Sequence, residues 1–266
     1  MRLLFAMIVF ACVSALTPTR VHTEGSFQVP VLLYHNLTTD STTDDAATLP
    51  VAEFSAQMAW LDGHDYTAIT TSDLENWLLR GDSLPPRPVL ITFDDGYQSN
   101  FDLAFPLLKE HGLKATIFVV TGAVGQQPGK YPHLSAATMQ AMARSGLIEF
   151  QAHSHDGHRL VGEVPALLAW SSPEIADDVD VLLETFAADE LQRPTAFAYP
   201  FGAFDDEAMA TLQTAGFDLA FTVEPGYARL GESPLRLQRQ IVYPGTPLCR
   251  FAEIVEGRAP GSACPR

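Results

Sequence analysis

Short apolar segments alternate with helix-like segments along almost the whole chain, and this alternation constrains the fold most strongly. The apolar segments have the length of buried strands, and the segments between them place apolar residues at helical spacing. The strand-like segments are 29–34, the short 68–69, 89–93, 115–120, 148–152, 196–199, 219–222 and 237–242. Strands that alternate with helices form a parallel sheet with the helices outside it. We therefore predict an α/β fold, a (β/α) barrel of seven to eight strands that is distorted or incomplete.

Chemically unusual residues follow several of these strands. They are His35, Asp94 with Asp95, the histidine-rich segment 153–158 and the segment 199–202. The carboxyl ends of parallel strands share one edge, where ligand binding and catalysis gather in such folds. We expect these residues to meet in one site.

Composition limits the partners and the number of domains. A chain of 266 residues, 47% of them hydrophobic, suffices for one α/β domain, and we assign residues 29–266 to it. The net charge of −16 repels phosphate backbones, so nucleic acid is excluded as a partner. The acidity favours a cationic polymer, with solubility or a saline habitat as the alternative explanation.

The N-terminus is typical of an exported protein, periplasmic or extracellular. Residues 1–15 combine a basic start with an apolar run and small residues for cleavage, and residues 16–28 form a polar leader. Cys12 loosely resembles a lipoprotein site, so a lipid anchor there is the alternative and the one predicted route to a membrane. After cleavage Cys249 and Cys264 remain, and export predicts that they form a disulfide. Two free thiols are the alternative.

Two adjacent carboxylates, Asp94 and Asp95, end a buried strand within the sequence Thr-Phe-Asp-Asp-Gly-Tyr at 92–97. Burying an unpaired charge is costly, so these groups must be solvated, paired or bound to a metal. Side chains alternate in direction along a strand, so one aspartate can bind a metal while the other reaches a water molecule. An ordinary turn is the alternative interpretation.

The segment 153–158 holds three of the eight histidines, with Asp156-Gly157 indicating a turn. Two imidazoles and one carboxylate form a common catalytic set for Zn²⁺. Spacing alone leaves open whether His153 pairs with His158 or with His155. A polar surface loop is the alternative.

Three motifs together resemble the polysaccharide deacetylases of carbohydrate esterase family 4. They are the segment 92–97, the histidine segment 153–158 and Tyr-Pro-Phe-Gly at 199–202, and the resemblance spans residues 29–245. The subgroup that the chain most resembles is the exported poly-β-1,6-N-acetyl-D-glucosamine deacetylases of bacterial biofilms. The points of similarity are Leu-Tyr-His-Asn at 33–36, Tyr-Gln-Ser at 97–99 and the His-x4-His spacing.

The resemblance implies a role for each site residue. Asp94 would be the general base and His35 the general acid, and the backbone around Tyr199 would stabilise the oxyanion. Asp95, His153 and His158 would bind one divalent metal ion, Zn²⁺. The wider family often reads Arg-Pro-Pro-Tyr-Gly in its third motif, where this chain has Ala-Tyr-Pro-Phe-Gly at 198–202. Arg239 is a candidate to replace the missing arginine and order the base, with a surface arginine as the alternative.

The predicted function is therefore a metal-dependent hydrolase that removes N-acetyl groups from an N-acetylglucosamine polymer and releases acetate. The poly-β-1,6-linked polymer is the expected polysaccharide partner. Alternatives are a deacetylase of chitin oligomers, peptidoglycan or acetylated xylan, and a catalytically silent glycan-binding domain.

Overall fold

The computed structural model describes residues 27–261 and residue 264. Its seven central strands close into a parallel barrel in the order β1-β12-β11-β10-β7-β6-β5, with β5 pairing back to β1. These strands are β1 (Val31–Tyr34), β5 (Pro88–Phe93), β6 (Ala115–Val119), β7 (Ile148–Ala152), β10 (Ala196–Ala198), β11 (Leu219–Pro225) and β12 (Leu237–Ile241). An eighth strand, β4 (Thr67–Ile69), pairs with the first residues of β5. The predicted barrel of seven to eight strands is confirmed.

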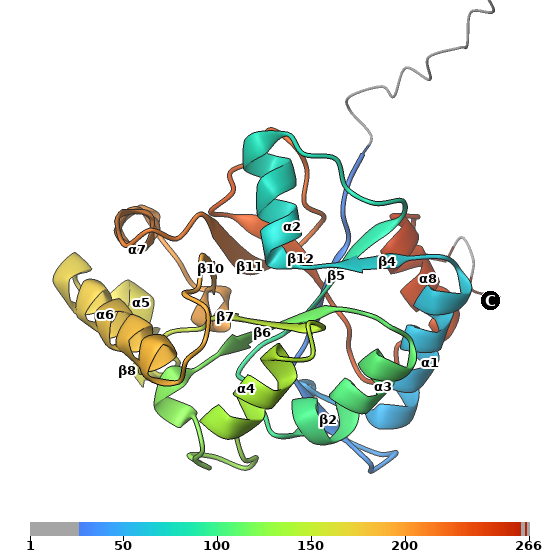
Figure 1. Cartoon of the computed structure of the whole chain (residues 1–266), viewed down its shortest axis with the longest axis horizontal. Helices are drawn as coiled ribbons and strands as arrows, with labels where there is room; N and C mark the ends of the chain where they lie inside the picture. The colour runs from blue at the N-terminus through green and yellow to red at the C-terminus, as the bar shows by residue number, and fades with distance from the viewer. Residues whose placement is uncertain (1–26, 262–263, 265–266) are drawn as a thin grey trace, which may run out of the picture.

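Helices surround the barrel, with α1 and α8 on one side, α6 and α7 on the opposite side, and α3 and α4 between them (Figure 1). The α-helices are α1 (Val51–Gly63), α2 (Thr71–Glu75), α3 (Phe105–Glu110), α4 (Ala136–Ala143), α5 (Ala166–Ala169), α6 (Ser172–Ala188), α7 (Asp206–Thr214) and α8 (Leu248–Glu256). Shorter helical turns are η1 (Asn76–Arg80), η2 (Asn100–Ala104), η3 (Thr121–Ala123) and η4 (Pro200–Gly202). Two small sheets pair β2 (Asn36–Thr38) with β3 (Thr48–Pro50) and β8 (Leu160–Val161) with β9 (Val164–Pro165).

Alternate strand residues pack into two separate apolar clusters, as the two-residue period of a strand requires. On β6, Ile117 joins the cluster shared with the helices, whereas Phe118 joins a second cluster. The rings of Phe118 and Phe221 lie 5.3 Å apart between centroids, although β6 and β11 are not neighbours in the sheet. The second cluster therefore fills the barrel interior.

One end of the barrel interior is closed by the segment that follows β4. Leu74 on α2 and Trp77 on η1 are buried in the interior cluster. The hydroxyl of Thr195, immediately before β10, donates to Glu75 on α2. The segment thus covers the amino ends of the strands and leaves the carboxyl ends available for a site.

A disulfide holds the C-terminal segment against α8. Cys249 on α8 and Cys264 are bonded, which confirms the predicted pair. The buried carboxylate of Glu253 accepts the N–H groups of Gly261 and Cys264, so the same segment is also held by hydrogen bonds. The predicted signal peptide, the leader up to residue 26 and Cys12 lie outside the described residues.

Removing the crosslink should weaken the folded state. The cysteines are 15 residues apart, and a loop of that size corresponds to about 3 kcal/mol of stabilisation in the chain-entropy model. We expect the double substitution Cys249→Ser and Cys264→Ser to lower the free energy of unfolding by about this amount, as measured by urea denaturation. An unchanged free energy of unfolding would show that the hydrogen bonds to Glu253 suffice.

Candidate active site

The carboxyl ends of β1 and β5 bring His35 and the two aspartates together. Tyr34 is in register with Phe93, so His35 and Asp94 are the next residues on neighbouring strands. The N–H of Asp94 donates to the carbonyl of Tyr34 at 3.0 Å. His35 is partly exposed.

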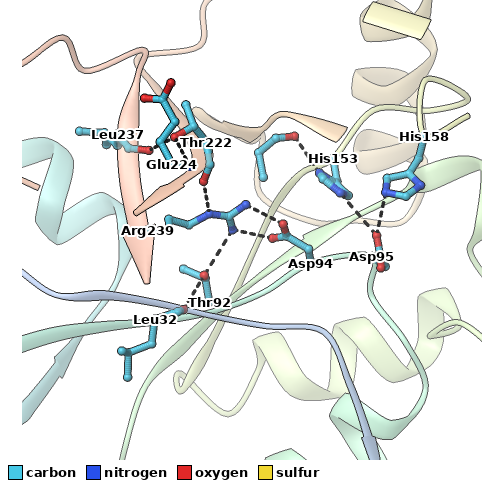
Figure 2. Close-up of polar contacts among 11 residues, drawn as sticks. Leu32, Thr92, Asp94, Asp95, His153, His158, Thr222, Glu224, Leu237 and Arg239 are labelled. Carbon is cyan, nitrogen blue, oxygen red and sulfur yellow. Dashed lines mark hydrogen bonds and ion pairs between the residues drawn. The ribbon is translucent and has the colours of Figure 1, made fainter. Parts of the chain in front are cut away.

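A backbone turn sends the two neighbouring aspartates in different directions. Asp95 has a φ of 72° and Gly96 a φ of 73°, so the chain leaves the strand through the left-handed region. A Cβ atom on residue 96 would lie 2.8 Å from Val119 Cγ1, which also favours glycine there. Asp94 consequently faces Arg239, and Asp95 faces two imidazoles (Figure 2).

Asp95, His153 and His158 converge on one point. Asp95 Oδ1 lies 3.4 Å from His153 Nε2 and 3.3 Å from His158 Nε2, and the three atoms lie within 4.8 Å of one another. Asp95 Oδ1 is buried and has no hydrogen-bond partner among the described residues. A buried carboxylate oxygen without a hydrogen bond, next to two imidazole nitrogens, is the arrangement of a metal site.

The tautomer of His153 also suits a metal. Its Nδ1 lies 2.7 Å from the carbonyl of Ala198, and a carbonyl can only accept, so Nδ1 carries the proton. The Nε2 lone pair is then directed at Asp95, as in metal-bound histidines whose other nitrogen is held by the backbone.

The charges of these three residues are strongly coupled. Burial acts to raise the pKa of Asp95, but the adjacent His153 and His158 hold it far below the ordinary range. Burial alone would lower the pKa of His153, yet the carboxylates of Asp94 and Asp95 raise it above its ordinary value. For His158, burial and the neighbouring His153 lower the pKa. A divalent cation would neutralise this cluster and favour unprotonated imidazoles.

Asp94 forms a bidentate ion pair with Arg239 (Figure 2). Arg239 Nη1 and Nη2 donate to the two Asp94 oxygens at 2.7 and 2.6 Å, and Arg239 Nε donates to the carbonyl of Thr222 at 2.8 Å. Arg239 is fully buried, so the alternative of a surface arginine is wrong. Burial raises the pKa of Asp94, but the charges of Arg239, His153 and His35 and the hydrogen bond from Arg239 together outweigh it. The net shift of the pKa is downward, which keeps Asp94 anionic.

The polar groups of Tyr199 itself are engaged elsewhere. Its buried hydroxyl donates to the carbonyl of Leu235, and its N–H donates to the carbonyl of Phe221. Neither polar hydrogen of Tyr199 itself is therefore available to an oxyanion, and the role of the backbone around Tyr199 stays a prediction. The turn η4 that follows does reach the site, since the ring of Phe201 packs on His158 at 4.5 Å between centroids.

Spacing alone left open whether His155 or His158 pairs with His153. In the structure His155 points away from Asp95 and His153. Its Nδ1 lies 3.0 Å from Thr121 Oγ1, and its carbonyl accepts the N–H of Gly122. A Cβ atom on residue 122 would lie 2.6 Å from that carbonyl oxygen, so only glycine allows the approach. The structure thus brings His153 and His158, not His155, to Asp95.

Sequence reasoning missed Asp178, which anchors the histidine loop. From α6 its buried carboxylate accepts the N–H of His155 at 2.9 Å and the N–H of Asp156 at 2.6 Å. Burial raises the pKa of Asp178 despite these two bonds. Asp178 lies three residues after Ile175 and four before Leu182, so helical spacing places it on the apolar face of α6. An aspartate on that face is the sequence signal that could have found it.

Comparison with known proteins defines the class. The family model described as polysaccharide deacetylase matches residues 81–220, more than half of the chain. YxkH of Bacillus subtilis (strain 168), which is named as a polysaccharide deacetylase, is 30% identical over 240 residues, covering 90% of this chain and 80% of that protein. The chain belongs to the polysaccharide deacetylase family.

Other relatives carry more specific names. The poly-β-1,6-N-acetyl-D-glucosamine N-deacetylase of Staphylococcus aureus (strain MRSA252) is 29% identical over 175 residues, covering 65% of this chain and 60% of that protein. IcaB from Ammonifex degensii superimposes with a TM-score of 0.74 at 26% identity, over 86% of this chain and 97% of that chain. The Streptococcus pyogenes deacetylase PplD, solved with acetate, shares the fold with a TM-score of 0.77 at 22% identity, over 86% and 98% of the two chains.

Replacing Asp178 tests whether the anchored histidine loop supports metal binding by Asp95, His153 and His158. In Asp178→Asn an amide NH₂ replaces one acceptor and opposes a backbone N–H, so we expect the loop to loosen and Zn²⁺ affinity to fall about tenfold or more. Competition with a chromogenic chelator measures the affinity. Asp177→Asn, an exposed neighbour on α6, is the matched control. Equal affinities for the two variants would contradict this role of Asp178.

Proposed function

We propose that this protein is a metal-dependent N-deacetylase that removes acetyl groups from an N-acetylglucosamine polymer, with poly-β-1,6-N-acetylglucosamine as the substrate class. The observation that carries the proposal is the buried Asp95 Oδ1, which has no hydrogen bond within the described residues and lies beside two imidazole nitrogens. The family membership supports polysaccharide deacetylation, and the names of the S. aureus relative and of IcaB support the polymer.

Asp95, His153 and His158 would hold the metal, and we propose Zn²⁺ because two imidazoles and a carboxylate are a frequent zinc set. When bound, the ion supplies Lewis-acid polarisation and a lowered pKa for water. Asp94 would act as the general base and accept the proton of the attacking water. Arg239 fixes both Asp94 oxygens, so the carboxylate is oriented before substrate arrives.

His35 would act as the general acid. It lies beside Asp94 at the end of β1, and its protonated imidazole can give a proton to the amine nitrogen as the carbon–nitrogen bond breaks. The proton balance then closes, because Asp94 gains a proton from water and His35 loses one to the leaving amine. The products are acetate and a free glucosamine unit.

The oxyanion donor that we propose is the N–H of Phe201. Pro200 has no N–H, and the N–H groups of Tyr199, Gly202 and Ala203 donate to the carbonyls of Phe221, Tyr199 and Pro200. Within the described turn 199–203 this leaves the N–H of Phe201, a residue whose ring packs on the His158 ring. A fixed backbone donor of this kind is worth about 3–4 kcal/mol to a developing oxyanion.

We also propose that the protein is exported, with residues 1–15 as a signal peptide, 16–28 as a leader and 29–266 as the catalytic domain. The Cys249–Cys264 disulfide supports an oxidising compartment. Among the described residues, no helix is long and apolar enough to span a membrane.

Replacing the base separates chemistry from metal binding. Asp94→Asn keeps the shape of the side chain but cannot accept the proton of water, so we expect acetate release to fall about a hundredfold or more. Because Asp95 and both histidines remain, Zn²⁺ should still bind with a stoichiometry of one, measured by calorimetry. Asp177→Asn serves as the surface control. Full activity of Asp94→Asn would mean that another group takes the proton.

The effect of Arg239 on the pKa of Asp94 can be measured from the pH dependence of kcat/KM. Arg239→Lys keeps the charge but loses the planar fork, so the pKa of Asp94 should rise. The base works as an anion, and activity is lost as the pH falls through its pKa. The acid limb of the kcat/KM profile should therefore move to higher pH, and kcat/KM should fall about tenfold or more.

Arg236→Lys provides the control for Arg239, because Arg236 is an exposed arginine paired with Glu224. Its profile should follow that of the unmodified protein. Superimposable acid limbs for Arg239→Lys and Arg236→Lys would show that Arg239 does not order the base.

A substrate panel distinguishes the proposed polymer from the alternatives. Acetate release is compared for oligomers of β-1,6-N-acetylglucosamine, chitin oligomers, peptidoglycan and acetylated xylan at matched acetyl concentrations. We expect the highest kcat/KM for the β-1,6-linked oligomers. Turnover of none of them, with the metal bound and the glycan retained, would instead favour the silent glycan-binding domain.

A further inference from the structure

His35 is bound through its backbone to the turn that follows the paired aspartates. It lies between β1 and β2, and its carbonyl accepts a hydrogen bond from Asn100 Nδ2 at 2.8 Å. Asn100 begins η2, five residues after Asp95, and is fully buried. Asn100, which the proposed mechanism does not use, therefore joins the segment of the proposed acid to the segment of the two aspartates.

The preceding residue, Ser99, binds the two residues that follow His35. Ser99 Oγ donates to Asn36 Oδ1 at 2.7 Å and accepts the N–H of Leu37 at 3.0 Å. Asn36 and Leu37 are both buried, so these hydrogen bonds are shielded from water. Residues 35–37 are thus held by two consecutive residues of one turn.

The fold pairs only one end of the Asn100 amide. Its Oδ1 is buried and has no hydrogen-bond partner within the described residues. A buried acceptor without a partner destabilises a fold, so an apolar residue of the same size would pack there at lower cost. The carbonyl of His35 can only accept a hydrogen bond, which requires the NH₂ of Asn100 to face it. The bond to His35 is therefore what the amide of Asn100 contributes.

The position of the His35 imidazole depends on this backbone contact. Among the described residues, Asn100 provides the one side-chain hydrogen bond to His35, and the imidazole forms none. A proton donor must lie within hydrogen-bond reach of the atom that it protonates, and a displacement of about 1 Å can cost about a hundredfold in rate. A residue that fixes the His35 backbone consequently sets the distance from the proposed acid to the leaving amine.

We propose that Asn100 is a positioning residue for proton transfer, because it holds the His35 backbone so that the imidazole keeps a fixed place beside Asp94. This inference rests on the proposed function, in which His35 is the general acid, and deepens it by adding a fully buried residue that acts through His35. Ser99 supports the same placement through Asn36 and Leu37.

The leaving group of the substrate tests this role. Release of a glucosamine amine needs a proton from the acid, whereas 4-nitrophenyl acetate releases a stable phenolate that needs none. Asn100→Leu has a similar size but no donor. We expect its ratio of kcat/KM for N-acetylglucosamine oligomers to kcat/KM for the ester to fall about tenfold. The fall should come from kcat for the oligomer with KM unchanged, because the buried Asn100 cannot contact the substrate.

Three further proteins serve as comparisons. His35→Ala removes the acid but keeps the backbone carbonyl that Asn100 binds, so it should lower the ratio at least as much. In the double variant of Asn100→Leu with His35→Ala, the ratio should equal that of His35→Ala alone, because Asn100 acts through His35. Asp102→Ala changes an exposed residue of the same turn and should leave the ratio unchanged.

An equal loss of both activities in Asn100→Leu would overturn the inference, since it would mean that Asn100 only supports the fold. An unchanged ratio would overturn it too, and so would a double variant whose ratio falls by the product of the two single effects. An unchanged ratio in His35→Ala, or no acetate release from the oligomer by the unmodified protein, would instead refute the proposed function and the inference with it.

Ser99→Ala decides the matter if circular dichroism shows that Asn100→Leu does not fold. Ser99 is only partly buried, and its replacement removes the two hydrogen bonds to Asn36 and Leu37. We expect a smaller fall of the same ratio, again absent in the His35→Ala background. A ratio equal to that of the unmodified protein would then overturn the inference.

Discussion

The buried ion pair between Asp94 and Arg239 is the interaction on which the site depends. Two charges placed in the apolar barrel interior would each cost several kcal/mol if left alone. Here the guanidinium meets both carboxylate oxygens and also the carbonyl of Thr222, and the rings of Phe118 and Phe221 lie about it. The pair therefore joins β5, β11 and β12 and presents a fixed carboxylate at the mouth of the barrel.

The turn at Asp95 gives the two aspartates at the end of β5 different surroundings. The left-handed backbone at residues 95 and 96 takes the chain out of the strand and directs Asp95 away from the barrel interior. With it, Asp94 is paired to a cation inside the barrel, and Asp95 reaches histidines that follow β7. One carboxylate is thus held as a fixed anion while the other keeps an oxygen without a hydrogen bond, which is the division of roles that the proposed hydrolysis requires.

The barrel and the position of the site could be predicted because both follow from local patterns. Alternating strand-like and helix-like segments imply parallel strands, and residues after such strands share one edge. The partner of Asp94 was harder to predict from the sequence. Arg239 is 145 residues away, and no local pattern distinguishes a buried arginine from an exposed one. The pairing of strands β11 and β12 brings Arg239 to its position beside Asp94.

The choice among histidines was decided by residues outside the motif. Thr121 and Asp178, from η3 and α6, hold His155 and its neighbour Asp156, and this leaves His158 to face Asp95. The spacing of the histidines within the loop does not predict those contacts. The hydrogen bonds of Tyr199 could not be predicted for a related reason, because its partners lie on the neighbouring strand β11 and at Leu235.

The most direct test of the central claim is a crystal structure of the protein soaked with Zn²⁺, with anomalous data collected at the zinc edge. We predict one anomalous peak within bonding distance of Asp95, His153 and His158, at about 2.0–2.2 Å from each ligand atom, with Asp94 still paired to Arg239. A peak bound through His155 or Asp94, or the absence of a peak in this cluster, would contradict it.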